Sequence, residues 1–156
     1  MLNIIQPTNA YFGQKDAAQC VLIRRIVSDL DMNVHINVID TMRETDGLAL
    51  SSRNAYLNLD ERKAAVVLYK SLCAAKELYY TKSTTSTINQ STICAADIKE
   101  IVMNVLQSES MVKEVQYVAV DNKETMEPLD EVGANGAVVS IACVVGSVRL
   151  IDNCII

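Results

Sequence analysis

The sequence predicts an α/β chain in two parts: a βαβ unit with parallel strands, then a smaller α+β part with an antiparallel sheet. Strand, helix and strand patterns follow one another within residues 9–39, which is typical of a right-handed crossover between parallel strands. Two helix patterns then precede a strand-rich segment, residues 115–151. Half of the 156 residues are hydrophobic and 21% are charged, which excludes a disordered or collagen-like chain.

The parallel unit comes first. Asn9–Phe12 is a short strand candidate closed by Gly13, and apolar residues recur at helical spacing over residues 15–30. Residues 34–39 alternate and are β-branched, which predicts a strand. The apolar segment before Pro7 has no N-cap signal and is expected to be the tail of an element that begins upstream. Because two parallel strands alone are not a stable sheet, we expect the chain to be the second part of a larger α/β protein.

The second part opens with a polar, turn-rich stretch, residues 41–59. Asn58 and Glu61 have the spacing of a capping box, which predicts a helix from there through about Tyr80. Residues 83–92 are low in hydrophobicity and are predicted to be a flexible connection.

A second helix is predicted around residues 98–106, and strands at residues 115–121 and 137–145. Gly146-Ser147 is a two-residue turn that leads into residues 148–151. Such a turn between two apolar, β-branched runs indicates a hairpin.

Charge and hydropathy exclude several classes of protein. The net charge of −5 makes bulk attraction to nucleic acid or anionic lipid unexpected, so we predict neither partner. No apolar run reaches the ~18 residues of a membrane span, and the N-terminus lacks a cationic flank and a cleavage site, which predicts a cytoplasmic protein. The mean hydropathy of +0.17 indicates apolar surface meant for a partner or for a missing piece of the same protein.

Two residue counts narrow the chemistry. A single histidine, His35, excludes any site that needs two imidazoles and leaves a Ser-His-Asp triad arithmetically open. The five cysteines are scattered and form no Cys-x-x-Cys pair, so we expect buried cytosolic thiols rather than a disulfide frame or a zinc site.

The first candidate site is Gly13-Gln14-Lys15-Asp16, at the carboxyl end of a strand and the start of a helix. Ligands of open α/β sheets bind at such ends. A phosphate there gains both the helix dipole and the Lys15 ammonium, and Asp16 is placed for a sugar hydroxyl. The alternative is a solvated lysine beside a capping aspartate. Gln19 follows Lys15 by four residues on the same face, either as a ligand contact or as a surface residue.

The second candidate site is the loop 46–54, in which Ser51 and Ser52 precede Arg53. Hydroxyls and backbone amides donate hydrogen bonds and a guanidinium supplies a bidentate charge, so this loop is a candidate oxyanion cradle. The alternative is that a serine caps a short helix and Arg53 pairs with a surface acid. His35 is interpreted as a strand residue rather than as a base.

Together these residues resemble the pantothenate synthetase (pantoate–β-alanine ligase) family. The resemblance rests on NIIQPTNAYFGQKDAAQ and DTMRETDGLALSSRNAYLNLDERKAA, and on VQYVAVD and GSVRLIDN nearer the end. It covers nearly the whole chain and is weakest over residues 76–114. The FGQKD and DGLALSSRN blocks are highly specific at this spacing.

The resemblance implies a fold and a reaction. Residues 1–40 would be the last βαβ unit of a Rossmann-like nucleotide-binding domain, and residues 41–156 a C-terminal α+β lid domain. The reaction would join (R)-pantoate to β-alanine, converting ATP to AMP and pyrophosphate with Mg²⁺ through a pantoyl adenylate. Because no covalent enzyme intermediate is needed, the protein's work would be positioning and charge stabilisation.

The resemblance also implies roles for single residues. Lys15, Ser51, Ser52 and Arg53 would be the catalytic contacts to phosphate, and Gln19 would bind pantoate. Asp16 would contact the ribose, and the backbone of Met42 the adenine. The whole ATP-binding set is Gly13, Gln14, Lys15, Asp16, Met42, Leu50, Ser51, Ser52 and Arg53. Gln14 stands where the family usually has Glu, Met42 stands where Val is common, and no residue is assigned to a metal.

The largest departure is an absence. The family carries an H-x-G-H motif near its N-terminus, and a sequence with one histidine cannot supply it. The resemblance therefore implies that the N-terminal domain, which holds most of the family's homodimer contact, is missing and that this chain is inactive alone. Two alternatives stay open: a non-catalytic module that binds nucleotide or a partner chain, and a nucleotidyl-transferring ligase with another acid substrate.

Overall fold

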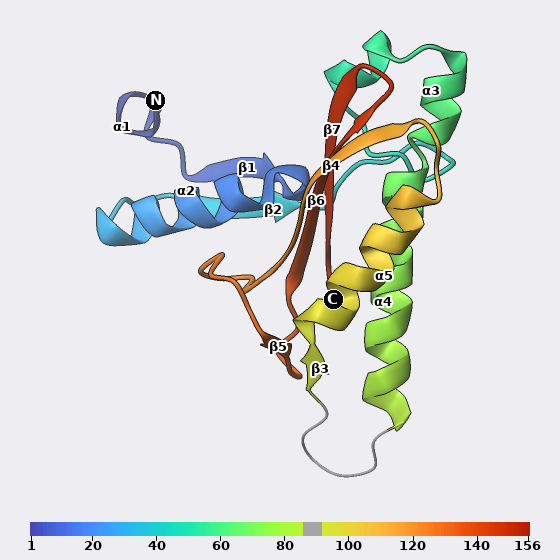
Figure 1. Ribbon diagram of the computed structural model, residues 1–156. Coiled ribbons are helices and arrows are strands. Elements are labelled where there is room, and N and C mark those ends of the chain that lie inside the picture. Colours follow the sequence, from blue (N-terminus) through green and yellow to red (C-terminus); the bar gives the residue numbers. More distant parts are fainter. Residues whose placement is uncertain (86–91) are drawn as a thin grey trace.

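The computed structural model describes residues 1–85 and 92–156, which form three layers (Figure 1). The central layer is an antiparallel sheet of β4 (Val112–Asp121), β6 (Val138–Val145) and β7 (Val148–Ile155), in that order. Helices α4 (Val67–Thr85) and α5 (Ala95–Gln107) cover one face of this sheet. The N-terminal unit lies against the other side and contacts β7. The predicted combination of a parallel unit with an antiparallel α+β part is confirmed.

The N-terminal unit is the predicted parallel crossover. It consists of α1 (Leu2–Ile5), β1 (Asn9–Gly13), the 3₁₀ turn η1 (Gln14–Asp16), α2 (Ala17–Asp29) and β2 (His35–Ile39). The strands β1 and β2 are parallel and in register over five residue pairs. No further strand among the described residues pairs with them.

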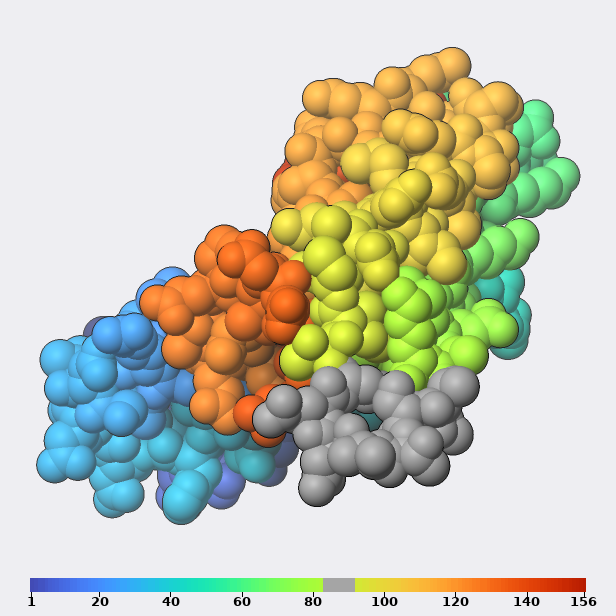
Figure 2. Space-filling view, turned by 60° about the horizontal axis from the view of Figure 1, so that its bottom comes forward, coloured from blue at the N-terminus to red at the C-terminus, as the bar shows by residue number. Residues whose placement is uncertain are grey.

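The apolar stripe that predicts α2 is largely exposed in the structure. Only Ala17 and Cys20 are buried, whereas Leu22 and Leu30 are 59% and 65% exposed. The reason is that a two-stranded sheet covers little of the helix. Figure 2 shows the unit (blue) projecting from the rest of the molecule beside the segment around residues 120–135 (orange).

The second part begins with the 3₁₀ turn η2 (Ser52–Tyr56) and α3 (Leu59–Ala64). The predicted capping box is confirmed: Asn58 Oδ1 accepts from the amide of Glu61 at 2.9 Å, and Glu61 Oε2 accepts from the amide of Asn58 at 2.9 Å.

The single helix expected from Asn58 to about Tyr80 is wrong, because the structure has α3 and α4 in its place. Between them the backbone tightens to i→i+3 hydrogen bonds, from Val66 to Lys63 and from Leu68 to Ala65. The adjacent β-branched pair Val66-Val67 favours such a break.

The predicted flexible connection at residues 83–92 is partly helical. Its first three residues belong to α4, and residues 86–91 lie outside the described part of the chain. Thr92 leads into β3 (Ile93–Cys94), which pairs with β5 (Glu131–Val132) in a two-residue ladder that the sequence did not predict.

The predicted hairpin of β6 and β7 is confirmed, with Gly146 at φ 59° in the turn. Strand β7 continues to Ile155, beyond the expected end at Ile151. The core lies between the sheet and its two helices, and its largest fully buried members include Leu68, Leu72, Ile98, Leu106 and Ile141.

The cysteines depart from the prediction that all five are buried. All are free thiols, and Cys20, Cys143 and Cys154 are buried, but Cys73 and Cys94 are exposed. Burial raises the pKa of Cys143 and of Cys154 to about 12, so these two thiols stay protonated and unreactive at neutral pH. Within the described residues, no helix combines the length and the apolar character that crossing a membrane requires.

Candidate functional site

The turn after β1 opens one wall of a cavity of about 270 Å³. Lys15, Asp16 and Gln19 line this wall, and Asp121 and Asp152 belong to the wall formed by the central sheet. The Asp16 side chain makes no capping hydrogen bond to α2. The structure thus brings three predicted site residues together and leaves both the Asp16 carboxylate and the start of α2 available.

The electrostatics of the cavity centre on Lys15. Burial of the ammonium lowers the pKa of Lys15, the Arg53 charge lowers it further, and the carboxylates of Asp16 and Asp152 partly oppose the change. Burial also raises the pKa of Asp121, against the opposing charge of Lys99. Neither Lys15 nor Arg53 has an ion pair with any residue that the structure describes. Lys15 and Arg53, which come from distant segments, thus lie close enough for the Arg53 charge to lower the pKa of Lys15.

The second predicted segment folds as a tight loop that leads into η2. The amide of Leu50 donates to the Met42 carbonyl at 2.9 Å, and Gly47 has a φ of 94°. Ser51 is the N-cap of η2, its Oγ accepting from the amide of Arg53 at 3.3 Å. The capping alternative therefore holds for Ser51, whereas Ser52 and Arg53 are exposed.

Asn54, the last residue of this loop, has a half-satisfied side chain. Its Nδ2 donates to the Ala49 carbonyl at 3.1 Å, while its Oδ1 is buried and has no hydrogen-bond partner within the described residues. A buried acceptor without a donor is costly, and a bound ligand is one way to satisfy it.

Both segments meet at β7. The turns η1 and η2 each contact this strand. Arg43 binds Asp152, and the Asn153 side chain donates to the carbonyls of Gln14 and Lys15. Sequence reasoning missed Arg43, Asp152 and Asn153 as site residues. The one local signal was a charged and an amide residue inside an apolar strand, where buried polar groups require partners.

Other predicted residues lie apart from the cavity. Met42 is 67% exposed and Leu50 is 48% exposed, and neither lines the cavity. The Gly13 carbonyl accepts from the Cys20 thiol at 3.4 Å, and Gln14 Nε2 donates to Asn153 Oδ1 at 3.3 Å.

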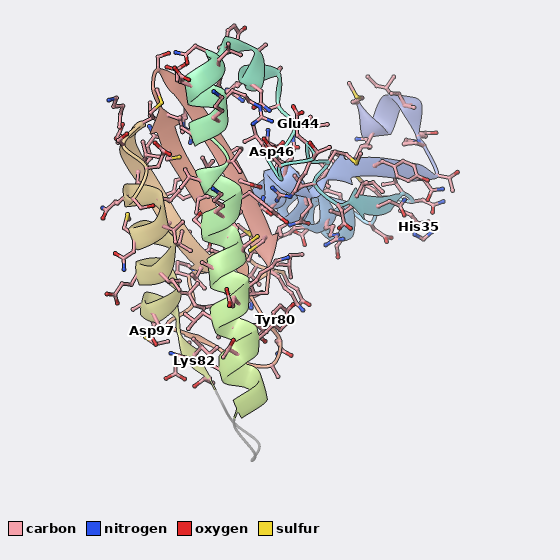
Figure 3. The ribbon with its side chains drawn as sticks, turned by 90° about the vertical axis from the view of Figure 1, so that its right-hand side faces the viewer. His35, Glu44, Asp46, Tyr80, Lys82 and Asp97 are labelled. Carbon is pink, nitrogen blue, oxygen red and sulfur yellow. The ribbon has the colours of Figure 1, made fainter. Side chains whose placement is uncertain are left out.

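His35 is remote from Lys15. It begins β2 and pairs with Asn9, at the opposite end of the parallel strands from Gly13. At ~3.3 Å per residue, that places it about 13 Å away along the strand. Figure 3 shows His35 at the far end of the N-terminal unit, away from Glu44 and Asp46 in the second segment. Among the described residues, no group of three or more His, Cys, Asp or Glu side chains is placed to hold a metal ion.

Comparison with known proteins identifies relatives over nearly the whole chain. The family model described as pantoate-beta-alanine ligase matches residues 1–155. Pantothenate synthetase from Chloroflexus aggregans is 44% identical over 153 residues, which are 98% of this chain and 52% of that protein. The protein of the same name from Acetivibrio thermocellus is 43% identical over 156 residues, all of this chain and 52% of its own length. The chain thus spans about half the length of the curated relatives it matches.

Solved structures agree with the sequence relatives. Pantothenate synthetase from Thermus thermophilus superposes with a TM-score of 0.85 at 36% identity, covering 98% of this chain and 51% of that one. A pantoate-beta-alanine ligase from Francisella tularensis, complexed with beta-gamma ATP and beta-alanine, has a TM-score of 0.59 at 26% identity, covering 99% and 46%.

Proposed function

Because the chain belongs to the pantoate–β-alanine ligase family, we propose that it supplies the ATP-binding part of a ligase that joins (R)-pantoate to β-alanine. In the proposed reaction the pantoate carboxylate attacks the α-phosphorus of ATP and pyrophosphate leaves. The amine of β-alanine then attacks the pantoyl adenylate carbonyl, and AMP leaves. The solved relative that holds beta-gamma ATP and beta-alanine supports this choice of substrates.

The observation that carries the proposal is the pair of cations that have no ion-pair partner within the described part of the chain. Lys15 and Arg53 come from segments 38 positions apart in the sequence (53 − 15), yet the Arg53 charge lowers the pKa of Lys15. The attraction of Lys15 to Asp16 and Asp152 is larger than its repulsion from Arg53, and neither cation forms an ion pair with the described residues, so both can bind a polyanion. A triphosphate has the charge and the length to do so.

Each residue then has a defined task. Lys15 and Arg53 neutralise phosphate charge that grows as pyrophosphate leaves, and Ser52 donates a hydrogen bond to the same group. Ser51 shapes the turn through its cap and offers its hydroxyl as a further contact.

The remaining residues orient the substrates. Asp16 accepts from a ribose hydroxyl, and Gln19, on the same cavity wall, binds pantoate. Gly13 and Gln14 shape the turn before Lys15, the backbone at Met42 borders the adenine, and Leu50 belongs to the loop that binds the triphosphate.

Magnesium enters this proposal with the nucleotide. The described residues provide no cluster of three metal-ligating side chains, so they do not form a protein cage for the ion. Mg²⁺ is usually held by substrate phosphates, water and one or two carboxylates. Asp16, which lines the cavity beside Lys15, would supply such a carboxylate.

We also retain the division into a Rossmann-like unit, residues 1–40, and a lid domain, residues 41–156, together with a cytoplasmic location and homodimers at full length, as proposals. They agree with the family assignment and are not needed for the site.

A second function is favoured by the position of His35. The sequence has no other histidine, and His35 lies at the end of β2 remote from Lys15. The chain would then be a non-catalytic module of this ligase family that binds nucleotide.

An assay of AMP release tests whether the chain catalyses the reaction by itself. The chain is incubated with ATP, Mg²⁺, pantoate and β-alanine beside a full-length relative as positive control. We expect ATP binding without turnover. Turnover at the rate of the full-length control would show that the 156 residues are a complete catalyst, and absence of ATP binding would remove both functions.

A further inference from the structure

Arg43 and Asp152 form a bidentate ion pair across the molecule. Nη1 lies 2.7 Å from Oδ2 and Nη2 lies 2.9 Å from Oδ1, and the Asp152 side chain is 2% exposed. A buried carboxylate with two parallel hydrogen bonds is held in one orientation. The pair therefore connects the segment before η2 rigidly to β7.

Arg43 also fixes the loop that carries the second site segment. Its Nη1 donates to the Gly47 carbonyl at 2.9 Å, and its guanidinium lies 4.8 Å from the centre of the Tyr69 ring. Its Nη2 reaches the Asn153 carbonyl at 3.3 Å. One side chain thus binds the loop, α4 and β7 together.

Asn153 extends the connection to the first site segment. Its amide donates to Asp152 Oδ1 at 2.8 Å, and its Nδ2 donates to the carbonyls of Gln14 at 3.0 Å and of Lys15 at 2.8 Å. Gln14 Nε2 returns a bond to Asn153 Oδ1 at 3.3 Å. The backbone that presents Lys15 is therefore bound directly by the residue next to Asp152.

We propose that Arg43, Asp152 and Asn153 form a positioning network that holds the Lys15 turn and the loop before Arg53 in a single arrangement for one polyanion. The proposal rests on the proposed function for the identity of that ligand. Asp152 and Asn153 also line the cavity, but the proposed role requires no contact between the three residues and the ligand. They act by keeping Lys15 and Arg53 at a fixed spacing, because their hydrogen bonds hold the Lys15 turn and the loop before Arg53 against β7.

The network predicts that a change at one segment is felt at the other. Asn153→Ser removes the bonds to the Lys15 turn and leaves the Arg43–Asp152 side-chain pair. Arg43→Lys removes the pair of parallel hydrogen bonds to Asp152 and leaves the Asn153 contacts to the Lys15 turn. Lys82→Gln is the matched control, because it breaks an ion pair of 2.7 Å with Asp97, and Figure 3 shows both residues far from Glu44, the sequence neighbour of Arg43.

Amide NMR spectra of the full chain detect this coupling between the two segments in the absence of any ligand. We expect Asn153→Ser to shift the amides of Gly47 and Leu48, and Arg43→Lys to shift the amides of residues 14–17, while Lys82→Gln shifts neither group. Shifts confined to the segment that each substituted residue contacts directly would overturn the network.

Titration with MgATP and with AMP then tests whether the network contributes to ligand binding. We expect Asn153→Ser and Arg43→Lys to weaken ATP binding about tenfold or more, with AMP affinity changed far less, because AMP lacks the β- and γ-phosphates that Lys15 and Arg53 would bind together. Equal loss of ATP and AMP binding would reduce the network to a structural role. If the wild type binds no ATP, the proposed function fails, and the NMR result still decides whether the two segments are coupled.

Discussion

Lys15 carries an ammonium that the fold partly removes from water. Burial, aided by Arg53, lowers its pKa below the ordinary 10.5. The charged form attracts phosphate, so ATP affinity should fall with rising pH at values where an exposed lysine is still charged. The free energy of unfolding responds with the opposite sign, since a lysine with a lower pKa in the folded state favours folding as pH rises towards 10.5.

The first prediction is this opposite pH dependence. Calorimetric titrations at a series of pH values rising towards 10.5 should show weakening ATP binding, while the contribution of Lys15 to the free energy of unfolding, obtained against Lys15→Ala, rises. Lys15→Arg should abolish the decline in affinity, because arginine stays charged throughout this range. An identical decline in Lys15→Arg would assign it to another group.

Gly47 is a second residue whose identity follows from its surroundings, because its backbone conformation and the nearby Tyr69 ring leave no room for a side chain. Its φ is 94°, and a Cβ at this position would collide with the Tyr69 ring. Gly47→Ala should lower the free energy of unfolding by at least about 1–2 kcal/mol from the backbone strain alone. Urea denaturation measures this.

Gly133→Ala is the matched control for Gly47→Ala. Its added Cβ meets only Thr92 Cγ2 at 3.8 Å, and Gly133 has no positive φ. It should change the free energy of unfolding by less than about 0.5 kcal/mol. Equal effects of the two substitutions would contradict the described geometry.

Among the elements, α3 owes its start to one capping box. Asn58→Ala removes an acceptor shared by the amides of Asp60 and Glu61 and should cost about 1 kcal/mol of stability. Asp60→Asn serves as control, since the Asp60 carboxylate is exposed and its nearest cation is 3.7 Å away. Urea midpoints of the two variants should differ clearly. A cost for Asp60→Asn equal to that for Asn58→Ala would show that the box is not what begins α3.

Local chemistry explains which elements the sequence could predict. The capping box of Asn58 and Glu61, the Gly146-Ser147 turn and the β-branched strand β2 each depend on neighbours within a few positions, and all three are confirmed. The break after Ala64 and the β3–β5 ladder depend on weak local preferences that packing decides. The exposure of Cys73 likewise depends on which face of α4 meets the sheet.

Long-range contacts explain what the sequence could not predict at the site. The Arg43–Asp152 bond joins residues 109 positions apart, and the Asn153–Gln14 bond joins residues 139 apart. No spacing rule reports on such pairs. Lys15, Asp16 and Gln19 were predicted as one site because a helix turn brings them together, and the cavity contains all three.

At the scale of the whole molecule, the N-terminal unit exposes apolar side chains that a sheet normally covers. Tyr11 is 67% exposed, Leu22 59%, Leu30 65% and Ile39 48%. The chain also spans 52% of the Chloroflexus aggregans relative. These two facts agree with the expectation that further strands and helices pack on β1, β2 and α2 in a working ligase.

Complementation tests this expectation. Adding the part of the Chloroflexus aggregans relative that this chain does not match should produce AMP release that neither polypeptide shows alone. Leu22→Lys, which places a charge on the exposed stripe of α2, should weaken the restored activity. Restoration that is unaffected by Leu22→Lys would direct attention to another face of the unit.

The most direct test of the central claim, that the Lys15 turn and the Arg53 loop together bind one triphosphate, is calorimetric titration of the chain with MgATP and AMP. The wild type should bind ATP more tightly than AMP. Lys15→Ala and Arg53→Ala should each lose about tenfold or more in ATP affinity, with little change for AMP, and the double variant should lose less than the two losses combined. ATP affinity that is the same in the wild type and in both single variants would contradict the claim.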